Sequence, residues 1–263
     1  MERHAWNYAK FKAAFYNKTG LELDRYKDKQ MERRIRQLME RENKPGFQHF
    51  YNYLVKDPPA MQFFLNYLTI NTSEFFRDQI VYARLKDEVF PELLKNFNHE
   101  LTIWSAGCSF GAEPYTVAIL FDTLKALHRV RIVGTDIDEK ALQEAKRGTY
   151  RGKYLDKMPR DLIQRYFFQE DEDFRIKPEI RNSITFNHHN LLRDRPLYGC
   201  HLILCRNVFI YFKPETQDYF LQCFSGALKA GGYLVIGSAE YISNPEKYQL
   251  KKSFNTIYQK IIG

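Results

Sequence analysis

A chain of 263 residues, 44% of them hydrophobic and 16% aromatic, is long enough for one large domain or two small ones and has ample apolar area for a core. This composition excludes a disordered chain, a collagen and a disulfide-stapled miniprotein. The net charge is +8, so we expect an acidic partner, which is nucleic acid, an anionic membrane surface or an acidic protein.

Nothing in the sequence predicts a membrane or secreted protein. No run of about 18 apolar residues is present, which excludes a membrane-spanning helix. The first residues lack the apolar segment of a secretory signal. The cysteines form no Cys-x-x-Cys pair, which favours reduced thiols; they are Cys108, Cys200, Cys205 and Cys223. We therefore expect a cytoplasmic monomer without membrane insertion.

The first 70 residues have the pattern of short polar helices. Apolar residues recur at helical spacing from Tyr8 to Phe15, and Gly20 then ends the first helix. Helices are predicted within 5–20 and 24–46, and over 47–55 and 59–68. The segment contains 13 Lys and Arg against 8 Asp and Glu, so +5 of the total charge lies in about a quarter of the chain.

After about residue 85, apolar strand-like runs alternate with helices. Strands are predicted at 101–106, 130–136, 184–189, 201–206, 233–238 and 254–260, with helices after the first, second and fourth of them. This alternation predicts an α/β fold with a parallel, doubly wound sheet. We expect a helical N-terminal domain and linker over 1–85. A second domain then covers 86–263, with a small inserted β subdomain at about 148–183.

A glycine turn joins the strand at 101–106 to the next helix. Its glycines, Gly107 and Gly111, are spaced GxxxG rather than GxGxxG, which argues against a dinucleotide with a pyrophosphate. Asp136 ends the next strand, where a carboxylate can accept hydrogen bonds from ribose hydroxyls. Asn190-Leu191 follows a third strand, where an adenine edge could be read. The three features in this order predict S-adenosylmethionine (SAM), whereas each alone is also typical of an ordinary packing turn.

Several longer strings resemble the CheR-type chemotaxis receptor methyltransferases. They are Asn71-Thr-Ser-Glu-Phe-Phe-Arg-Asp78, Trp104-Ser-Ala-Gly-Cys-Ser-Phe-Gly-Ala-Glu-Pro-Tyr115, Thr135-Asp-Ile-Asp138, Cys205-Arg-Asn-Val-Phe-Ile-Tyr-Phe212 and Gly232-Tyr-Leu-Val-Ile-Gly-Ser-Ala-Glu240. The resemblance covers nearly the whole chain and implies a Rossmann-like SAM-dependent methyltransferase sheet. It also implies methyl transfer from SAM to glutamate side chains on the cytoplasmic helical bundle of chemoreceptors. The products are then glutamyl methyl esters and S-adenosylhomocysteine.

The resemblance also assigns site residues. The implied cofactor contacts are Asn71, Ser73, Arg77, Gly107, Glu113, Asp136, Asn190, Leu191, Cys205, Arg206 and Asn207. Tyr211 is the implied tyrosine near the methyl group, and Arg77 is expected to span cofactor and substrate. Arg34 is the implied arginine that meets the substrate carboxylate, with Arg33 as the fallback.

Two positions depart from the family pattern. The usual Gly-Glu-Glu-Pro reads Gly111-Ala-Glu-Pro114, so the first acid is replaced by Ala112. Some members grip a receptor pentapeptide with a glycine-rich loop, but here the corresponding stretch is acidic and lacks glycine over 168–174. We therefore expect methylation that is independent of a receptor C-terminal pentapeptide.

The expected chemistry requires few specialised side chains. A glutamate is ionised at pH 7, so its methylation needs no general base, and the sequence has no obvious Ser-His-Asp or Cys-His arrangement. We expect no metal, because His188-His189 has no further ligands at a suitable spacing.

Two other functions remain open at this point. One is a nucleic-acid methyltransferase, although no Asn-Pro-Pro-Tyr string is present. The other is a non-catalytic SAM-binding regulator, which Ala112 alone supports. The basic helices favour an acidic receptor bundle over nucleic acid as the partner.

Overall fold

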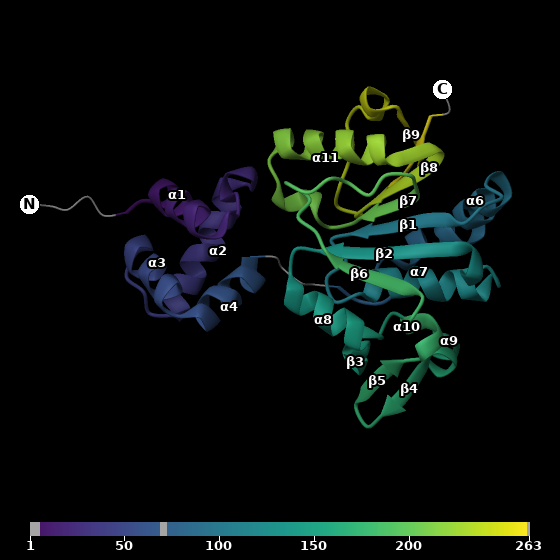
Figure 1. Cartoon of the computed structure of the whole chain (residues 1–263), viewed down its shortest axis with the longest axis horizontal. Coiled ribbons are helices and arrows are strands. Elements are labelled where there is room, and N and C mark those ends of the chain that lie inside the picture. Colours follow the sequence, from purple (N-terminus) through teal and green to yellow (C-terminus); the bar gives the residue numbers. More distant parts are fainter. Residues whose placement is uncertain (1–5, 69–72, 262–263) are drawn as a thin grey trace, which may run out of the picture. The chain divides into compact units, whose positions relative to one another are not determined.

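The computed structural model describes residues 6–68 and 73–261, which form two compact units (Figure 1). The first unit comprises Met1–Ile70 and Tyr211–Asp218, and the second comprises Asn71–Ile210 and Tyr219–Gly263. No helix in the described ranges is both long enough and apolar enough to cross a membrane.

The first unit is helical, as the sequence predicts. Its helices are α1 (Tyr8–Thr19), α2 (Asp28–Arg41), α3 (Phe47–Lys56) and α4 (Pro58–Leu68), with a short 3₁₀ turn at Leu23–Arg25. The side chain of Asn7 accepts a hydrogen bond from the Lys10 N–H at 2.9 Å and caps α1. The core is aromatic: Phe11, Phe15, Phe50 and Phe64 are fully buried, and the Phe15 and Phe64 ring centroids lie 5.2 Å apart.

The segment Tyr211–Asp218 is bonded to the helical unit through its backbone. The Lys27 N–H donates to the Tyr211 carbonyl at 2.9 Å, and the Lys213 N–H donates to the Arg25 carbonyl at 2.9 Å. The Phe212 ring lies 4.5 Å from the ring of Tyr26. The main chain at Tyr211 is therefore fixed by the start of α2 and the turn before it.

The second unit contains a seven-stranded sheet with the order β6-β2-β1-β7-β8-β10-β9. The strands are β1 (Leu101–Ala106), β2 (Val130–Asp136), β6 (Ile184–His188), β7 (Cys200–Cys205), β8 (Leu228–Ile236), β9 (Leu250–Phe254) and β10 (Ile257–Lys260). The first five strands of that order are parallel, whereas β10 runs antiparallel to both β8 and β9. The predicted doubly wound sheet is confirmed, whereas its antiparallel edge and strand β9 were not predicted.

Helices cover both faces of the sheet (Figure 1). On one face, α7 (Ala112–Thr123) packs on β1, β2 and β6, and α8 (Glu139–Arg147) packs on β2 and β6. On the other face, Trp104 of β1 meets Phe224 of α11 (Pro214–Ala227) with ring centroids 5.4 Å apart. Burial on both faces explains why β1, β2 and β7 read as continuous apolar runs. Three further helical segments, α5 (Gln79–Arg84), a π-helical turn (Leu85–Val89) and α6 (Phe90–Asn96), precede β1.

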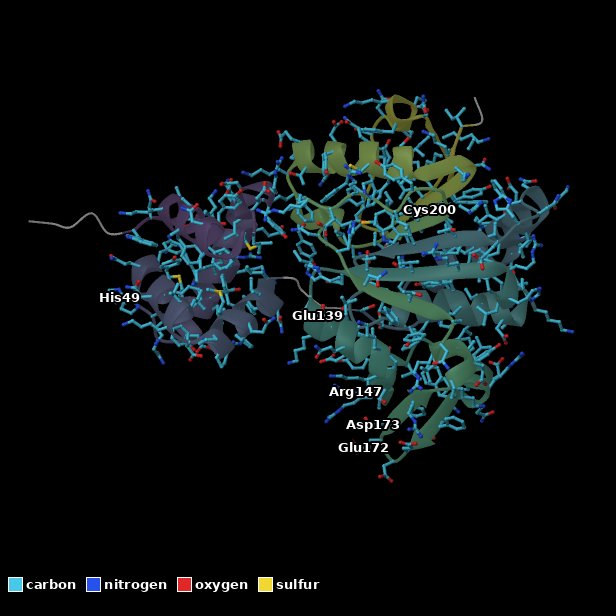
Figure 2. The ribbon with its side chains drawn as sticks, viewed as in Figure 1. His49, Glu139, Arg147, Glu172, Asp173 and Cys200 are labelled. Carbon is cyan, nitrogen blue, oxygen red and sulfur yellow. The ribbon has the colours of Figure 1, made fainter. Side chains whose placement is uncertain are left out.

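The inserted segment forms a small antiparallel sheet with the order β3-β5-β4. Its elements are β3 (Thr149–Arg151), α9 (Arg160–Tyr166), β4 (Phe167–Glu170), β5 (Asp173–Ile176) and α10 (Pro178–Arg181), with a 3₁₀ turn at Gly152–Tyr154. The hairpin between β4 and β5 carries Glu172 and Asp173 at its end (Figure 2). The predicted β subdomain is confirmed, and its hairpin presents acidic side chains.

A buried histidine lies at the amino-terminal end of β7. His201 is 2% exposed, and its Nδ1 accepts a hydrogen bond from the Thr102 N–H at 2.9 Å. The ring proton therefore belongs on Nε2, which lies 3.2 Å from Nε2 of His99. Burial, together with the nearby His99 and Lys229, lowers the pKa of His201 from 6.5 to about 4. The folded chain therefore favours the neutral ring.

We predict that His201→Asn reduces the acid sensitivity of folding. The unfolded chain binds the proton at about pH 6.5, so stability from neutral His201 is complete above that pH and is lost as pH falls toward about 4. Asn keeps an acceptor for the Thr102 N–H but does not titrate. The fall in Tm over this window should be shallower in the variant than in the wild type. The same change at exposed His49 is the control (Figure 2). Parallel Tm curves for wild type and His201→Asn would contradict the prediction.

Candidate functional site at the carboxyl edge of the sheet

The glycine turn after β1 lies against the end of β2. The N–H groups of Gly107 and Cys108 both donate to the Thr135 carbonyl, at 2.8 and 2.9 Å. Gly107 has φ of 84°, and a Cβ there would lie 2.9 Å from Cγ2 of Val208. Glycine adopts this positive φ without strain and leaves room for the Val208 side chain. The turn therefore keeps the backbone close to the segment that follows β7.

Asp136 is buried where β2 ends beside this turn. Its carboxylate accepts hydrogen bonds from the Ser109 N–H at 2.7 Å and the Asp138 N–H at 2.9 Å. Burial raises the pKa of the Asp136 carboxyl, and these backbone donors oppose that rise. A carboxylate has about four acceptor positions, so Asp136 can still receive a ribose hydroxyl.

Glu113 and Arg206 form a buried ion pair. Arg206 Nη1 lies 3.4 Å from Glu113 Oε2, and the Ser105 hydroxyl donates to Glu113 Oε1 at 2.7 Å. Burial raises the pKa of Glu113, whereas Arg206, the Ser105 hydroxyl and Arg77 oppose the rise. The structure thus brings together Glu113, Arg206 and Arg77, which stand far apart in the sequence. It also adds Ser105, which the sequence did not single out as a site residue.

The loop after β6 reaches the same edge. The His189 N–H donates to the Asp136 carbonyl at 2.9 Å. Asn190 follows and is half-buried, with its N–H bonded to Asp194 at 2.7 Å and its side-chain oxygen accepting from the Leu192 N–H at 2.9 Å. Leu191 is also half-buried. The loop that carries the predicted adenine contacts is therefore attached to Asp136.

Glu240 joins the loops that follow β7 and β8. Its carboxylate accepts hydrogen bonds from the N–H groups of Gly237 at 2.6 Å, Asn207 at 3.0 Å and Ile210 at 3.2 Å. A Cβ at Gly237 would lie 2.7 Å from the Asn207 nitrogen, so glycine is needed there. Asn207 itself has φ of 61°. Glu240 was missed as a site residue, and the only signal was its place at the end of the last family-like string.

The remaining predicted site residues differ in how deeply they are buried. Asn71 lies outside the described residues, and Ser73 is half-buried. Cys205 ends β7 and is fully buried, and burial raises the pKa of its thiol well above the usual range. The thiol is therefore inert, and a small residue packs at the end of this strand.

Arg34 and Tyr211 belong to the helical unit. The Arg34 guanidinium lies over the Tyr67 ring, 4.7 Å from its centroid, and donates to the Tyr67 carbonyl. Arg33, one residue earlier on α2, is exposed. The sequence-based role of Arg34 toward a substrate stays a prediction.

The residues at the carboxyl edge fit an adenosine cofactor. Two buried polar atoms there, Ser109 Oγ and Arg206 Nε, have no hydrogen-bond partner in the part of the chain that is described. Carboxylates with spare acceptor positions, a close glycine turn and unpaired donors match a ligand with hydroxyls and a charged amino-acid end. No group of three His, Cys, Asp or Glu within residues 6–68 and 73–261 could hold a metal.

A site at the carboxyl edge of such a sheet suits an adenosine cofactor, and comparison with family models identifies the class as a SAM-dependent methyltransferase. Residues 71–258 match the CheR methyltransferase SAM-binding domain, and residues 7–69 match the CheR methyltransferase all-alpha domain. The chain belongs to the CheR methyltransferase family, and SAM is its cofactor.

Two similar curated proteins are named chemotaxis protein methyltransferases. The chain is 36% identical to a chemotaxis protein methyltransferase of Listeria innocua, covering 92% of each chain. It is 32% identical to a chemotaxis protein methyltransferase of Borreliella burgdorferi, covering 86% of this chain and 85% of the relative. Among solved structures, a TehB-like SAM-dependent methyltransferase from Corynebacterium glutamicum matches with a TM-score of 0.40 and 15% identity, over 81% of this chain and 96% of that one.

We predict that Glu240→Gln weakens SAM binding. The amide would direct an NH₂ group at backbone N–H donors, and a lost hydrogen bond to a charged group costs about 1.5–3 kcal/mol. Because the affected loop carries Asn207, SAM affinity by calorimetry should fall by about tenfold, and Tm should fall by a few degrees. Glu246→Gln, at an exposed position, is the control. An unchanged affinity for Glu240→Gln would contradict the prediction.

Proposed function

We propose that this chain transfers the methyl group of SAM to glutamate side chains on the cytoplasmic helical bundle of chemoreceptors. The products are glutamyl methyl esters and S-adenosylhomocysteine. Family membership supports the reaction class. The substrate class rests on one observation: the titratable groups at the carboxyl edge are already engaged with other groups of the protein.

The titratable groups at this edge are already engaged with other groups of the protein. Glu113 is paired with Arg206, and Asp136 accepts two backbone N–H groups. Burial raises the pKa of the Cys108 thiol well above its usual range. A substrate that is already ionised at neutral pH requires no base, and a glutamate side chain is such a substrate.

The reaction then depends on alignment and on a dry site. Bound SAM supplies a methyl group on a positively charged sulfur. The chain must hold the attacking carboxylate in line with it, and good orientation can lower a barrier by about 7–11 kcal/mol. Exclusion of water also raises the reactivity of the carboxylate. We assign Arg77 to orient carboxylate and cofactor, and Tyr211 to shape the methyl pocket.

Ala112 gives no support to a regulator that only binds SAM. Its side chain is fully buried in the apolar core at the start of α7. A residue in that environment does not face a ligand, so the missing acid removes no cofactor contact. Glu113, the next residue, retains its partners Arg206 and Ser105.

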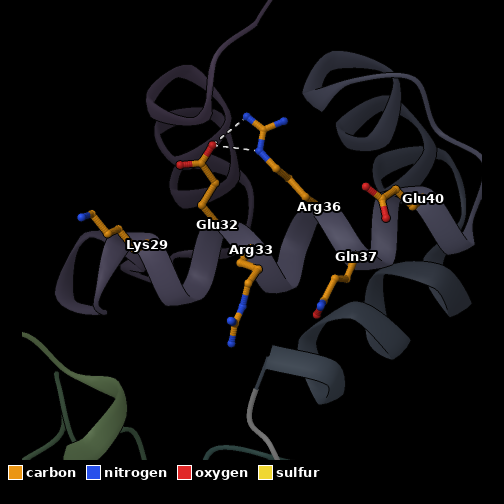
Figure 3. Close-up of a pocket in the computed structure, with 6 residues that line it drawn as sticks. All are labelled: Lys29, Glu32, Arg33, Arg36, Gln37 and Glu40. Carbon is orange, nitrogen blue, oxygen red and sulfur yellow. Dashed lines mark hydrogen bonds and ion pairs between the residues drawn. The ribbon is translucent and has the colours of Figure 1, made fainter.

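The outer face of α2 is our candidate surface for the receptor. It forms a shallow pocket of about 400 Å³ lined by Lys29, Glu32, Arg33, Arg36, Gln37 and Glu40 (Figure 3). Arg36 is paired with Glu32 at 2.7 Å, whereas Arg33 is exposed and pairs with no other described residue. Together with the excess basic charge of the N-terminal helices, this face suits an acidic helix bundle. The acidic hairpin between β4 and β5 supports methylation without a receptor pentapeptide.

The direct test uses labelled SAM and a receptor cytoplasmic fragment. Base-labile incorporation that is released as methanol supports glutamate methylation. Arg77→Ala and Tyr211→Phe should both lower turnover, because one removes the orienting cation and the other alters the methyl pocket. The proposal fails if wild-type chain that binds SAM modifies no cognate receptor. The site assignment fails if both variants keep near-wild-type turnover and SAM affinity.

A second prediction separates the two arginines of α2. Arg33→Ala removes an exposed charge, so it should raise the KM for receptor severalfold at low salt, lose this effect at high salt, and leave Tm unchanged. Arg34→Ala should lower Tm as well, because it breaks the contact with Tyr67. Lys18→Ala on α1 removes the same charge from another helix and is the control. An equal effect of Lys18→Ala on KM would show that only net charge matters.

A further inference from the structure

The guanidinium of Arg206 holds the chain segment that contains Arg77. Its two terminal nitrogens donate four hydrogen bonds, and three go to this segment: to the Arg77 carbonyl at 2.8 Å, Asp78 Oδ2 at 2.6 Å and the Tyr82 hydroxyl at 3.0 Å. The fourth goes to Glu113 at 3.4 Å. The Arg206 side chain is 3% exposed. The bonds are therefore made where water cannot compete for the donors.

The backbone on both sides of Arg77 needs such a partner. Phe76 has φ of 53° and Asp78 has φ of 62°, so two left-handed residues flank Arg77. Side chains other than glycine adopt this conformation at a cost, and it persists only where surrounding contacts enforce it. Arg206 supplies those contacts at the Arg77 carbonyl and at the Asp78 side chain.

Tyr82 completes the cluster from the first turn of α5. It is 1% exposed, and the Arg206 guanidinium carbon lies 5.1 Å from the centroid of its ring. The tyrosine thus meets Arg206 both through its hydroxyl and through its ring. Without the hydroxyl, one terminal nitrogen of Arg206 would have only the long contact to Glu113.

We propose that Tyr82 and Asp78 are positioning residues that act through Arg206 to fix Arg77 at the cofactor site. Tyr82 and Asp78 need not touch SAM or the substrate. They set the place of Arg206, and Arg206 sets the left-handed turn from which the Arg77 side chain extends. The inference rests on the role of Arg77 in the proposed function.

The test is a double-mutant cycle of Tyr82→Phe and Arg77→Ala. SAM dissociation constants are measured by calorimetry, kcat/KM is measured with a receptor fragment, and Tm is measured for every variant. In the wild-type background, Tyr82→Phe should weaken SAM binding or kcat/KM about fivefold or more. In the Arg77→Ala background the same change should have almost no effect, because its target has been removed.

A matched control separates positioning from stability alone. The Tyr115 hydroxyl donates to the Ala145 carbonyl at 2.8 Å, and this tyrosine is fully buried outside the Arg206 cluster. Tyr115→Phe should therefore lower Tm without changing SAM affinity. Asp78→Asn is the second variant, and it should reproduce the Tyr82→Phe coupling to Arg77.

Each contrary outcome has one meaning. If Tyr82→Phe has its full effect in the Arg77→Ala background, the positioning inference is wrong. The same holds if Tyr82→Phe changes only Tm, as Tyr115→Phe is expected to do. If Arg77→Ala alone changes neither SAM affinity nor kcat/KM, the assigned role of Arg77 fails instead, and the proposed function is the part in error.

Discussion

The buried guanidinium of Arg206 is the interaction on which the carboxyl edge of the sheet depends. It joins the segment before α5, the first turn of α7 and the end of β7. Desolvation of such a charge is expensive, and a buried ion pair is rarely a net gain in stability. Its partners Asp78, Glu113 and Tyr82 compensate that cost only in one geometry. The cluster therefore specifies where three distant segments meet.

Glu240 holds the neighbouring loops together, as Arg206 holds together the segment before α5 and the first turn of α7. One anion binds three backbone N–H groups from the loops after β7 and β8. Arg206 and Asn207 are adjacent in the chain. Asp78 and Glu113 hold the side chain of Arg206, and Glu240 holds the N–H of Asn207, so two successive residues at the end of β7 are fixed. The parallel sheet supplies the frame, because its strands end together at the point where the strand order changes direction between β1 and β7.

The sequence predicted the strands of the sheet much better than the polar contacts that hold the loops at its carboxyl edge. β1 and β2 were predicted with the bounds that the structure has, because buried parallel strands are continuous apolar runs. β9 was missed because Leu250–Phe254 is short and mostly polar, as edge strands are. β8 was predicted to begin at 233 but begins at Leu228, since Gly231-Gly232 resembles a helix end. The local sequence pattern also could not show that β10 runs antiparallel to its neighbours.

The site was predicted in part, for a similar reason. Glu113, Asp136 and Arg206 stand at strand and helix ends that periodicity locates, and the resemblance gave them roles. The partners Tyr82 and Glu240 could not be found this way, because Tyr82 is 124 residues from Arg206 and Glu240 is 33 from Asn207. Nothing in a single sequence states which distant polar side chains share one buried volume.

The way Arg206 is occupied also bears on the chemistry. A carboxylate nucleophile loses negative charge as it attacks, so a cation that binds it tightly stabilises the ground state more than the transition state. Arg206 would be such a cation if it were free, but Asp78, Glu113, Tyr82 and the Arg77 carbonyl take the donors of its terminal nitrogens. Arg206 thus organises the segments around the site. In the proposed function it is Arg77 that meets the substrate, and because its side chain is only half-buried, water can weaken its hold on the reacting carboxylate.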